Sequence, residues 1–285
     1  MIPRMEQAAR RGYVAVAADL RHHGTRAATP TSYARALEAS LRGLPARGPL
    51  PPVAPASYLL DSVYDLTHVL DYLCLRGDVD TSRIGALGVG HGGTVAWLLA
   101  ASDERVAATA TVLGAVDFQW LIDARRFGDY VGTVRSTGYL ELDLPRSSAQ
   151  ALALGEAVRG WSKSAKGKEA IAAAPRSAGK DGDDLPAAVA ERVLDRLAMG
   201  LRTHFSAPRA MCAIAPRPLF IAAGELDSKL PVEAVEATEA ALDIAYADAP
   251  DGTCVVRIYR DVMDTVPVAV DDDVDVWLDA KLLVS

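Results

Sequence analysis

The stretch from Arg83 to Ala96, which reads R-I-G-A-L-G-V-G-H-G-G-T-V-A, most constrains what this 285-residue chain can fold into. Ile84 to Val89 is a short apolar run typical of a buried parallel strand, and from Thr94 onward the apolar spacing becomes helical. Four glycines lie among six residues between the two, which indicates a sharp turn with close backbone approach and positive φ. The stretch therefore predicts a strand, a tight turn and a helix whose first N–H groups point at the turn.

Two kinds of chemistry use this shape. One is the nucleophile elbow Gly-x-Ser-x-Gly, which fits Gly88, Gly90 and Gly92 except that Gly90 stands at the serine position. The other is the dinucleotide pattern Gly-x-Gly-x-x-Gly, which Gly88, Gly90 and Gly93 match, with Asp117 near the offset of the acidic partner. The stretch alone leaves both interpretations open.

Composition narrows the class of protein. The chain is 50% hydrophobic, enough for one large core or a core with a small cap, and its net charge of -7 argues against nucleic acid or anionic membrane as main partners. No apolar run reaches the roughly 18 residues of a membrane span, so we expect no membrane insertion. The N-terminus lacks a signal-peptide apolar region and the three cysteines are widely spaced, which predicts an intracellular protein, cytoplasmic or organellar and not secreted. No metal-ligand cluster is visible, and we predict no metal and no cofactor.

The rest of the chain alternates between strand and helix patterns, which predicts an α/β fold with a mostly parallel sheet covered on both faces. The predicted strands are 13–18, 84–89, 106–113, 219–223 and 254–259, and the predicted helices are 2–11, 59–75, 94–102, 232–246 and 270–283. We expect residues 1–117 and 206–285 to form the core and 118–205 to form a helical cap insert. Within the insert, Lys163 to Leu185 is predicted to be the most mobile part, and 41–57 is predicted to be a loop.

Four blocks of the chain resemble the α/β-hydrolase superfamily, in particular its dienelactone-hydrolase, acetylxylan-esterase and prolyl-oligopeptidase-like branch. They are R-G-Y-V-A-V-A-A-D-L-R-H-H-G (11–24), D-V-D-T-S-R-I-G-A-L-G-V-G-H-G-G (78–93), A-I-A-P-R-P-L-F-I-A-A-G-E-L-D (213–227) and V-V-R-I-Y-R-D-V-M-D (255–264). The resemblance implies a three-layer α/β-hydrolase fold and outranks the dinucleotide interpretation. In the family a strand precedes the first helix predicted here, so we expect an N-terminally truncated sheet. The segment at 13–18 should then pair directly with 84–89, or another segment or another chain should fill the gap between them.

The same resemblance implies a degenerate catalytic triad. Gly90 occupies the nucleophile position, Asp227 matches the acid, and Asp264 falls where the family's histidine is expected. A carboxylate at that position would repel Asp227 rather than relay a proton. The backbone N–H of His91, which follows the nucleophile position, is the expected oxyanion donor. No catalytic set is intact, and Asp227 is better explained as a loop or capping residue.

The sequence therefore predicts a pseudoenzyme, a non-catalytic α/β-hydrolase-fold protein. It would act by binding a small-molecule ligand or a protein partner in a larger assembly. One alternative is an active serine-hydrolase-like esterase or peptidase, and another is a dinucleotide-binding protein built on Gly88, Gly90 and Gly93. His22 and His23 follow the first predicted strand and could line the pocket, although loop histidines are usually structural.

Overall fold

The structure is a computed structural model that describes residues 2–29, 58–127, 199–263 and 265–283, with a few single positions between 32 and 195. The helices and strands are, in chain order, α1 (Ile2–Arg10), the 3-10 turn η1 (Gly24–Arg26), α3 (Tyr58–Cys74), β1 (Ile84–Val89), α4 (His91–Ser102), β2 (Val106–Val112), α5 (Phe118–Asp123), α10 (Ala207–Cys212), β3 (Leu219–Gly224), α11 (Val232–Ala245), β4 (Cys254–Tyr259) and α12 (Val268–Leu282).

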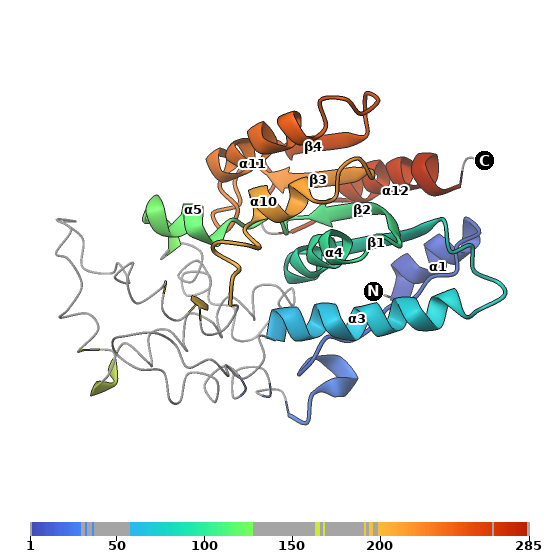
Figure 1. Cartoon of the computed structure of the whole chain (residues 1–285), viewed down its shortest axis with the longest axis horizontal. Helices are drawn as coiled ribbons and strands as arrows, with labels where there is room; N and C mark the ends of the chain where they lie inside the picture. The colour runs from blue at the N-terminus through green and yellow to red at the C-terminus, as the bar shows by residue number, and fades with distance from the viewer. Residues whose placement is uncertain are drawn as a thin grey trace.

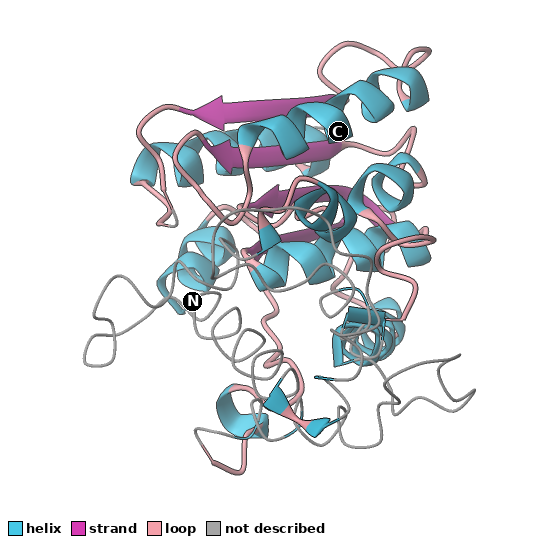
Figure 2. Ribbon diagram, turned by 90° about the vertical axis from the view of Figure 1, so that its left-hand side faces the viewer, coloured by secondary structure: helices cyan, strands magenta, loops and turns pink. Residues whose placement is uncertain are grey.

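The four strands form one sheet in the order β1-β2-β3-β4, and every neighbouring pair is parallel (Figure 2). All six residues of β3 are buried, and β2 is buried at every position except Ala107. Continuous burial explains why these strands read as apolar runs rather than as alternating patterns. The predicted strands at 84–89 and 254–259 have the predicted bounds, and the other two differ by one residue. The α/β fold class is confirmed.

Helices cover both faces of the sheet, which gives three layers. Figure 1 shows α4 and α12 on opposite sides of the strands. Side chains of β3 alternate accordingly, since Phe220 packs in the apolar cluster of α12 whereas Ile221 packs in the larger cluster with α3, α4, α10 and α11. Trp97 of α4 is fully buried in that larger cluster.

The segment at 13–18 corrects the sequence prediction, because it is extended but is not a strand. Val14 and Val16 are 45% and 51% exposed, so the predicted burial is wrong as well. The described part of the chain provides no backbone hydrogen bond from residues 14–18, and so the predicted direct pairing with β1 is also wrong. The β-branched composition favours an extended backbone, but a strand also needs a partner edge.

Charge rather than apolar packing docks α1 onto α12. Arg4 pairs with Asp271 and Asp275, and Arg11 pairs with Asp275 and Asp279. None of residues 3–10 is buried. The helix predicted near the N-terminus is therefore present, but its attachment to the other end of the chain could not be read from its own sequence.

Most of the predicted cap insert lies outside the described residues, as do the 41–57 loop and nearly all of Lys163 to Leu185. The described start of the insert is α5, which buries Phe118, Leu121 and Ile122. The division into a core and a cap stays a prediction.

Candidate functional site

The turn after β1 has the geometry of an elbow. Gly90 has φ 55° and ψ -121°, a conformation that side-chain-bearing residues rarely adopt. Its N–H donates to the carbonyl of Val112 at 2.7 Å, and its own carbonyl accepts the N–H of Thr94 at 3.0 Å. The turn thus joins the end of β1 to the first turn of α4 and is held to β2 at the same time.

The neighbouring glycines are required by close packing. A Cβ added at Gly88 would overlap the carbonyl of Gly92, and one added at Gly93 would lie 2.6 Å from the hydroxyl of Thr111. A Cβ at Gly114, just after β2, would lie 2.6 Å from the carbonyl of Gly90. Packing at Gly88 and Gly93 and the backbone conformation of Gly90 therefore account for the glycines of the Gly-x-Gly-x-x-Gly pattern without a bound dinucleotide.

Two side chains of α4 fix this helix against the end of β2. Both the Thr94 hydroxyl and the Trp97 indole N–H donate to the carbonyl of Gly114, at 2.8 and 3.0 Å. These buried hydrogen bonds satisfy a carbonyl that would otherwise face the core. The elbow is therefore held by backbone and side-chain contacts together.

His91 is the first residue of α4 and lies beside His23, with 6.3 Å between the ring centroids. Burial, and secondly the charge of His23, lower the pKa of His91 to about 4, so its ring is neutral at neutral pH. His23 in turn donates through Nδ1 to the carbonyl of Arg21 at 2.7 Å. His22 has a positive φ of 63°. The loop that carries His22 and His23 thus lies next to the elbow, and His23 is hydrogen-bonded within this loop.

Asp227, at the position of the triad acid, follows β3 and is buried. Its carboxylate accepts the backbone N–H of Lys229 at 2.9 Å, which is the local turn bond of a loop aspartate. The loop is also tied to the segment after β4, because the N–H of Leu226 donates to the carbonyl of Val262 at 2.9 Å. Asp264 comes just after that segment and lies outside the described residues. The hydrogen bond from Lys229 to Asp227 agrees with the interpretation of Asp227 as a loop or capping residue.

Strand order puts these positions along one edge of the sheet. Since the strands are parallel, their carboxyl ends meet at the same edge, and β1 and β3 are separated only by β2. Strands are spaced at about 4.8 Å, which puts Gly90 and the start of the Asp227 loop roughly 10 Å apart. The arrangement offers a helix N-terminus, a neutral histidine and a buried carboxylate. It offers no nucleophile at the elbow.

Asp117 has a structural role. It is the N-cap of α5, and its carboxylate accepts the N–H groups of Gln119 and Trp120 at 3.0 and 3.2 Å. Burial raises the pKa of this carboxyl group. The carboxylate of Asp117 therefore caps α5, whereas the dinucleotide interpretation needs it to bind a ribose hydroxyl.

A cavity of about 370 Å³ lies between residues 18–26 and α3 and was not predicted from the sequence. Asp65 lies on the wall of this cavity. Its carboxylate accepts two hydrogen bonds of 2.8 Å from Arg21 and forms an ion pair with Arg26 at 2.8 Å. The paired guanidinium groups, Arg21 first, lower the pKa of Asp65 to about 2. The only signal in the sequence was the pair Asp61 and Asp65, four residues apart on one helix face.

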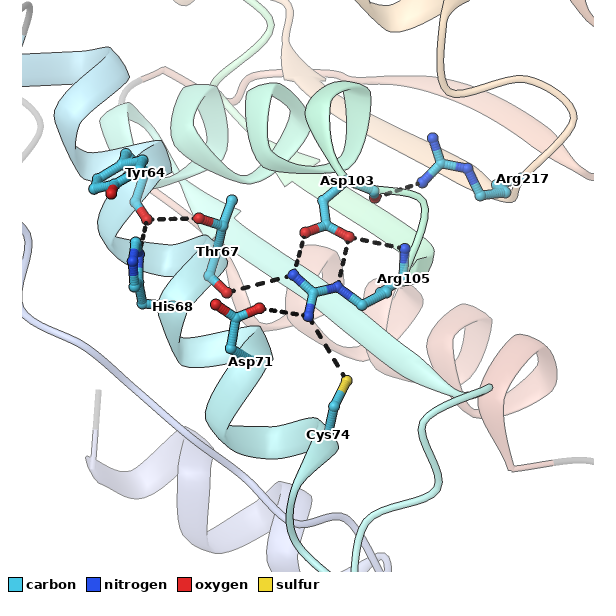
Figure 3. Close-up of polar contacts among 8 residues, drawn as sticks. All are labelled: Tyr64, Thr67, His68, Asp71, Cys74, Asp103, Arg105 and Arg217. Carbon is cyan, nitrogen blue, oxygen red and sulfur yellow. Dashed lines mark hydrogen bonds and ion pairs between the residues drawn. The ribbon is translucent and has the colours of Figure 1, made fainter.

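A second charged cluster lies at the opposite end of the sheet, where β2 begins (Figure 3). Arg105 donates to Asp103 at 2.6 and 2.9 Å and to Asp71 of α3 at 2.8 Å. Arg217, just before β3, donates to the carbonyl of Asp103 at 3.1 Å. These bonds tie α3 to the loop before β2, so the cluster supports the fold and is remote from the elbow.

Among the described residues, no group of three or more His, Cys, Asp or Glu side chains is placed to hold a metal ion. None of the described helices is both long enough and apolar enough to span a membrane.

Residues 3–128, which include the elbow, match the Dienelactone hydrolase family. The match agrees with the parallel sheet, the helices on both of its faces and the sharp turn after β1. The chain has an α/β-hydrolase fold. The match includes the blocks 11–24 and 78–93 and confirms the suspected resemblance to the α/β-hydrolase superfamily.

Three further proteins are similar to this chain over different parts of its length. YtaP of Bacillus subtilis (strain 168) is 40% identical over 60 residues, which are 21% of this chain and 20% of that protein. An acetyl xylan esterase from Paenibacillus sp. R4 is 16% identical with a TM-score of 0.48, over 83% of this chain and 60% of that one. A glucuronoyl esterase from Solibacter usitatus is 14% identical with a TM-score of 0.46, over 82% and 52%. The chain thus spans about half of the glucuronoyl esterase and a fifth of YtaP.

Proposed function

We propose that this α/β-hydrolase-fold chain binds a ligand or a protein partner without cleaving it. The observation that carries the proposal is Gly90, because the elbow keeps its special backbone conformation while the residue at its apex has no side chain. Covalent hydrolysis needs a nucleophile within hydrogen-bond reach of a base. The nucleophile position of this elbow supplies neither an attacking atom nor a proton for a base to remove.

Two further observations support binding without catalysis. The carboxylate of Asp227 accepts a local backbone N–H, which suits a structural acid. The cavity beside α3, at about 370 Å³, falls within the range of about 300–1,000 Å³ that is usual for small-molecule sites. Leu20, Leu66 and Val69 give it apolar walls, and Arg26 gives it a charged one.

The proposal is tested by assaying the purified chain with p-nitrophenyl acetate and with a peptide p-nitroanilide. We expect rates equal to those in buffer, unchanged in Asp227→Ala. Asp272→Ala, which removes an exposed carboxylate of α12, is the matched control. Turnover that Asp227→Ala abolishes and Asp272→Ala preserves would overturn the proposal and favour an active esterase or peptidase.

The dinucleotide alternative has its own test. Binding of NAD to the folded state alone would raise the melting temperature by mass action. We expect no shift, since the elbow glycines and Asp117 are accounted for by packing and capping. A rise that grows with NAD concentration and disappears in Asp117→Asn would favour the alternative.

A further inference from the structure

His91 places an imidazole ring at the start of α4, where a positive charge is unfavourable. The N-terminal end of a helix carries a partial positive charge, which disfavours an imidazolium but not a neutral ring. Burial, and secondly the charge of His23, lower the pKa of His91 to about 4. The packed arrangement at the elbow therefore requires the neutral ring.

The ring of His23 is the neighbouring group that acts on His91, with 6.3 Å between the two ring centroids. The rest of α4 and the whole of β1 and β2 carry no charged or titratable side chain. The other charged or titratable residues at this end of the sheet are not among the groups that shift the pKa of His91; they are Asp19, Arg21, His22 and Arg26 in the loop of His23, Asp117 after β2, and Glu225, Asp227 and Lys229 after β3. Two imidazolium rings at this separation would repel each other, so both histidines favour the closed arrangement only while they are neutral.

The loop that carries His23 is fixed to α3 on both sides of its tip. Before the tip, Arg21 donates to Asp65 through two bonds of 2.8 Å and pairs with Asp61 at 2.9 Å. After the tip, Arg26 pairs with Asp65 at 2.8 Å. Because Arg21 and Arg26 lower the pKa of Asp65 to about 2, these anchors stay charged in mildly acidic solution.

The tip between the anchors, His22 to Gly24, is a tight turn. His22 has a positive φ of 63°, a left-handed conformation that residues with a side chain rarely adopt, and Gly24 has a φ of 52°. Nδ1 of His23 donates to the carbonyl of Arg21 at 2.7 Å, so protonation of this ring adds its charge at Nε2. A rearrangement of these three residues would relieve the strain at His22 and leave both anchors in place.

We propose that protonation of His91 in mildly acidic solution moves the tip from His22 to Gly24 away from the elbow, while the loop stays anchored on α3. The imidazolium would gain solvent and distance from His23, and the first N–H groups of α4 would become accessible at the elbow. The contact between the two rings thus acts as an acid-sensitive gate. This inference goes beyond the proposed function, because it concerns access to the elbow and holds whether or not the elbow is catalytic.

The two pKa values of His91 define the pH range of the gate. The closed state lowers the pKa from the ordinary value of 6.5 to about 4, so the open state binds the proton more tightly. The closed state carries no penalty well above pH 6.5, and the penalty grows as the pH falls towards about 4. Counting His91 alone, the opening equilibrium is roughly 70-fold larger at pH 4.5 than at pH 7.5. The Asp65 anchor titrates below this range, so the two events are separate.

The test is amide hydrogen exchange of the whole chain at pH 7.5 and pH 4.5, with rates corrected for the intrinsic pH dependence of exchange. We expect the protection of residues 22–24 and 91–93 to fall by at least about tenfold at the lower pH. The amides of the fully buried strand β3 should keep their protection, because the opening is local. Equal protection of the tip at both pH values, or an equal fall in β3, would overturn the proposal.

Two variants separate His91 from other effects of acid. His91→Gln keeps a polar but uncharged side chain and should abolish the fall in protection, whereas His204→Gln, at an exposed site, should leave it intact. A fall of the same size in His91→Gln would contradict the assignment of the gate to this ring. Titration of the His91 ring signals by nuclear magnetic resonance keeps the test independent of whether His91→Gln folds. A ring that titrates near 6.5 in the parent while the tip stays protected would overturn the proposal as well.

Discussion

Glycine has two separate roles at the elbow. At Gly88, Gly93 and Gly114 a side chain would collide with neighbouring backbone or with Thr111. At Gly90 the requirement is conformational, because φ is 55° and ψ is -121°. At the nucleophile position of a hydrolase, a residue with a side chain adopts this strained conformation because catalysis requires it. Here glycine has this conformation without a side chain at the apex, and the backbone hydrogen bonds of Gly90 join the end of β1 to α4 and β2.

Replacing Gly90 by alanine should therefore cost stability. We expect Gly90→Ala to lower the free energy of unfolding by about 1–3 kcal/mol, the usual cost of a strained backbone conformation. Gly92→Ala is the matched control, since an added Cβ at Gly92 meets nothing within 4 Å and the residue is helical. It should leave stability unchanged or raise it by up to about 1 kcal/mol. Urea unfolding measures both, and equal losses in the two variants would contradict the strain argument.

Asp65 should make stability depend on acid pH. Its pKa is about 2 in the folded protein because Arg21 and Arg26 bind the carboxylate, compared with an ordinary value of 3.8. A lowered pKa stabilises the folded state fully above the ordinary value, and this contribution is lost as the pH falls from about 4 to about 2. Partial exposure reduces it to about 1–2 kcal/mol. We expect Asp65→Asn to be less stable than the parent at pH 6 and to approach it at pH 2.

The control for this titration is Asp272→Asn, since Asp272 is exposed and makes no ion pair with a described residue. Chemical unfolding at a series of pH values should show the same pH dependence for this variant and the parent. A constant difference between Asp65→Asn and the parent across the acid range would contradict the assigned pKa.

At the scale of elements, the sequence predicted what local patterns control. Strand 84–89 and its glycine turn were predictable because apolar runs and glycines act within a few residues. The segment at 13–18 was predicted wrongly, although its composition is just as apolar, because a strand requires a partner edge that composition does not reveal. The docking of α1 on α12 was likewise hidden, since Arg4 and Asp271 lie at opposite ends of the chain.

The attachment of α1 should weaken with salt. Its ion pairs with α12 are partly exposed, and pairs of this kind contribute about 0.2–1 kcal/mol each, roughly 1–3 kcal/mol together. Raising the salt to about 1 M shortens the screening length to about 3 Å. We expect faster amide hydrogen exchange in α1 at high salt and, at low salt, in the double variant Arg4→Gln, Arg11→Gln.

The matched control is Arg10→Gln, because Arg10 is exposed and forms no ion pair with a described residue. Exchange of α1 in this variant should equal that of the parent at every salt concentration. Exchange in α1 that does not respond to salt or to the double variant would indicate that something other than charge holds the helix.

At the scale of the whole molecule, the candidate site depends on strand order. The sequence could predict that Gly90 and Asp227 each follow a strand, and parallel pairing in the order β1-β2-β3 brings both to one edge of the sheet. It also indicated a local bond at Asp227, which the N–H of Lys229 supplies, but it could not predict contacts between loops such as that of His91 with His23. Such contacts depend on side-chain geometry across loops, which no local pattern specifies.

Rebuilding the triad by mutation tests whether the missing side chains are all that separates this chain from a hydrolase. We expect Gly90→Ser combined with Asp264→His to stay within about tenfold of the buffer rate with p-nitrophenyl acetate. A serine at φ 55° adds about 1–3 kcal/mol of strain, and the carboxylate of Asp227 already accepts the backbone N–H of Lys229. Mass spectrometry of the elbow peptide distinguishes the acylation step from the deacylation step. A serine that stays acylated means that attack works and deacylation fails. Full turnover by the double variant would show that the elbow and the oxyanion donor at His91 remain competent. In that case the loss of two side chains would be the whole difference, and the scaffold around them would still be that of an enzyme.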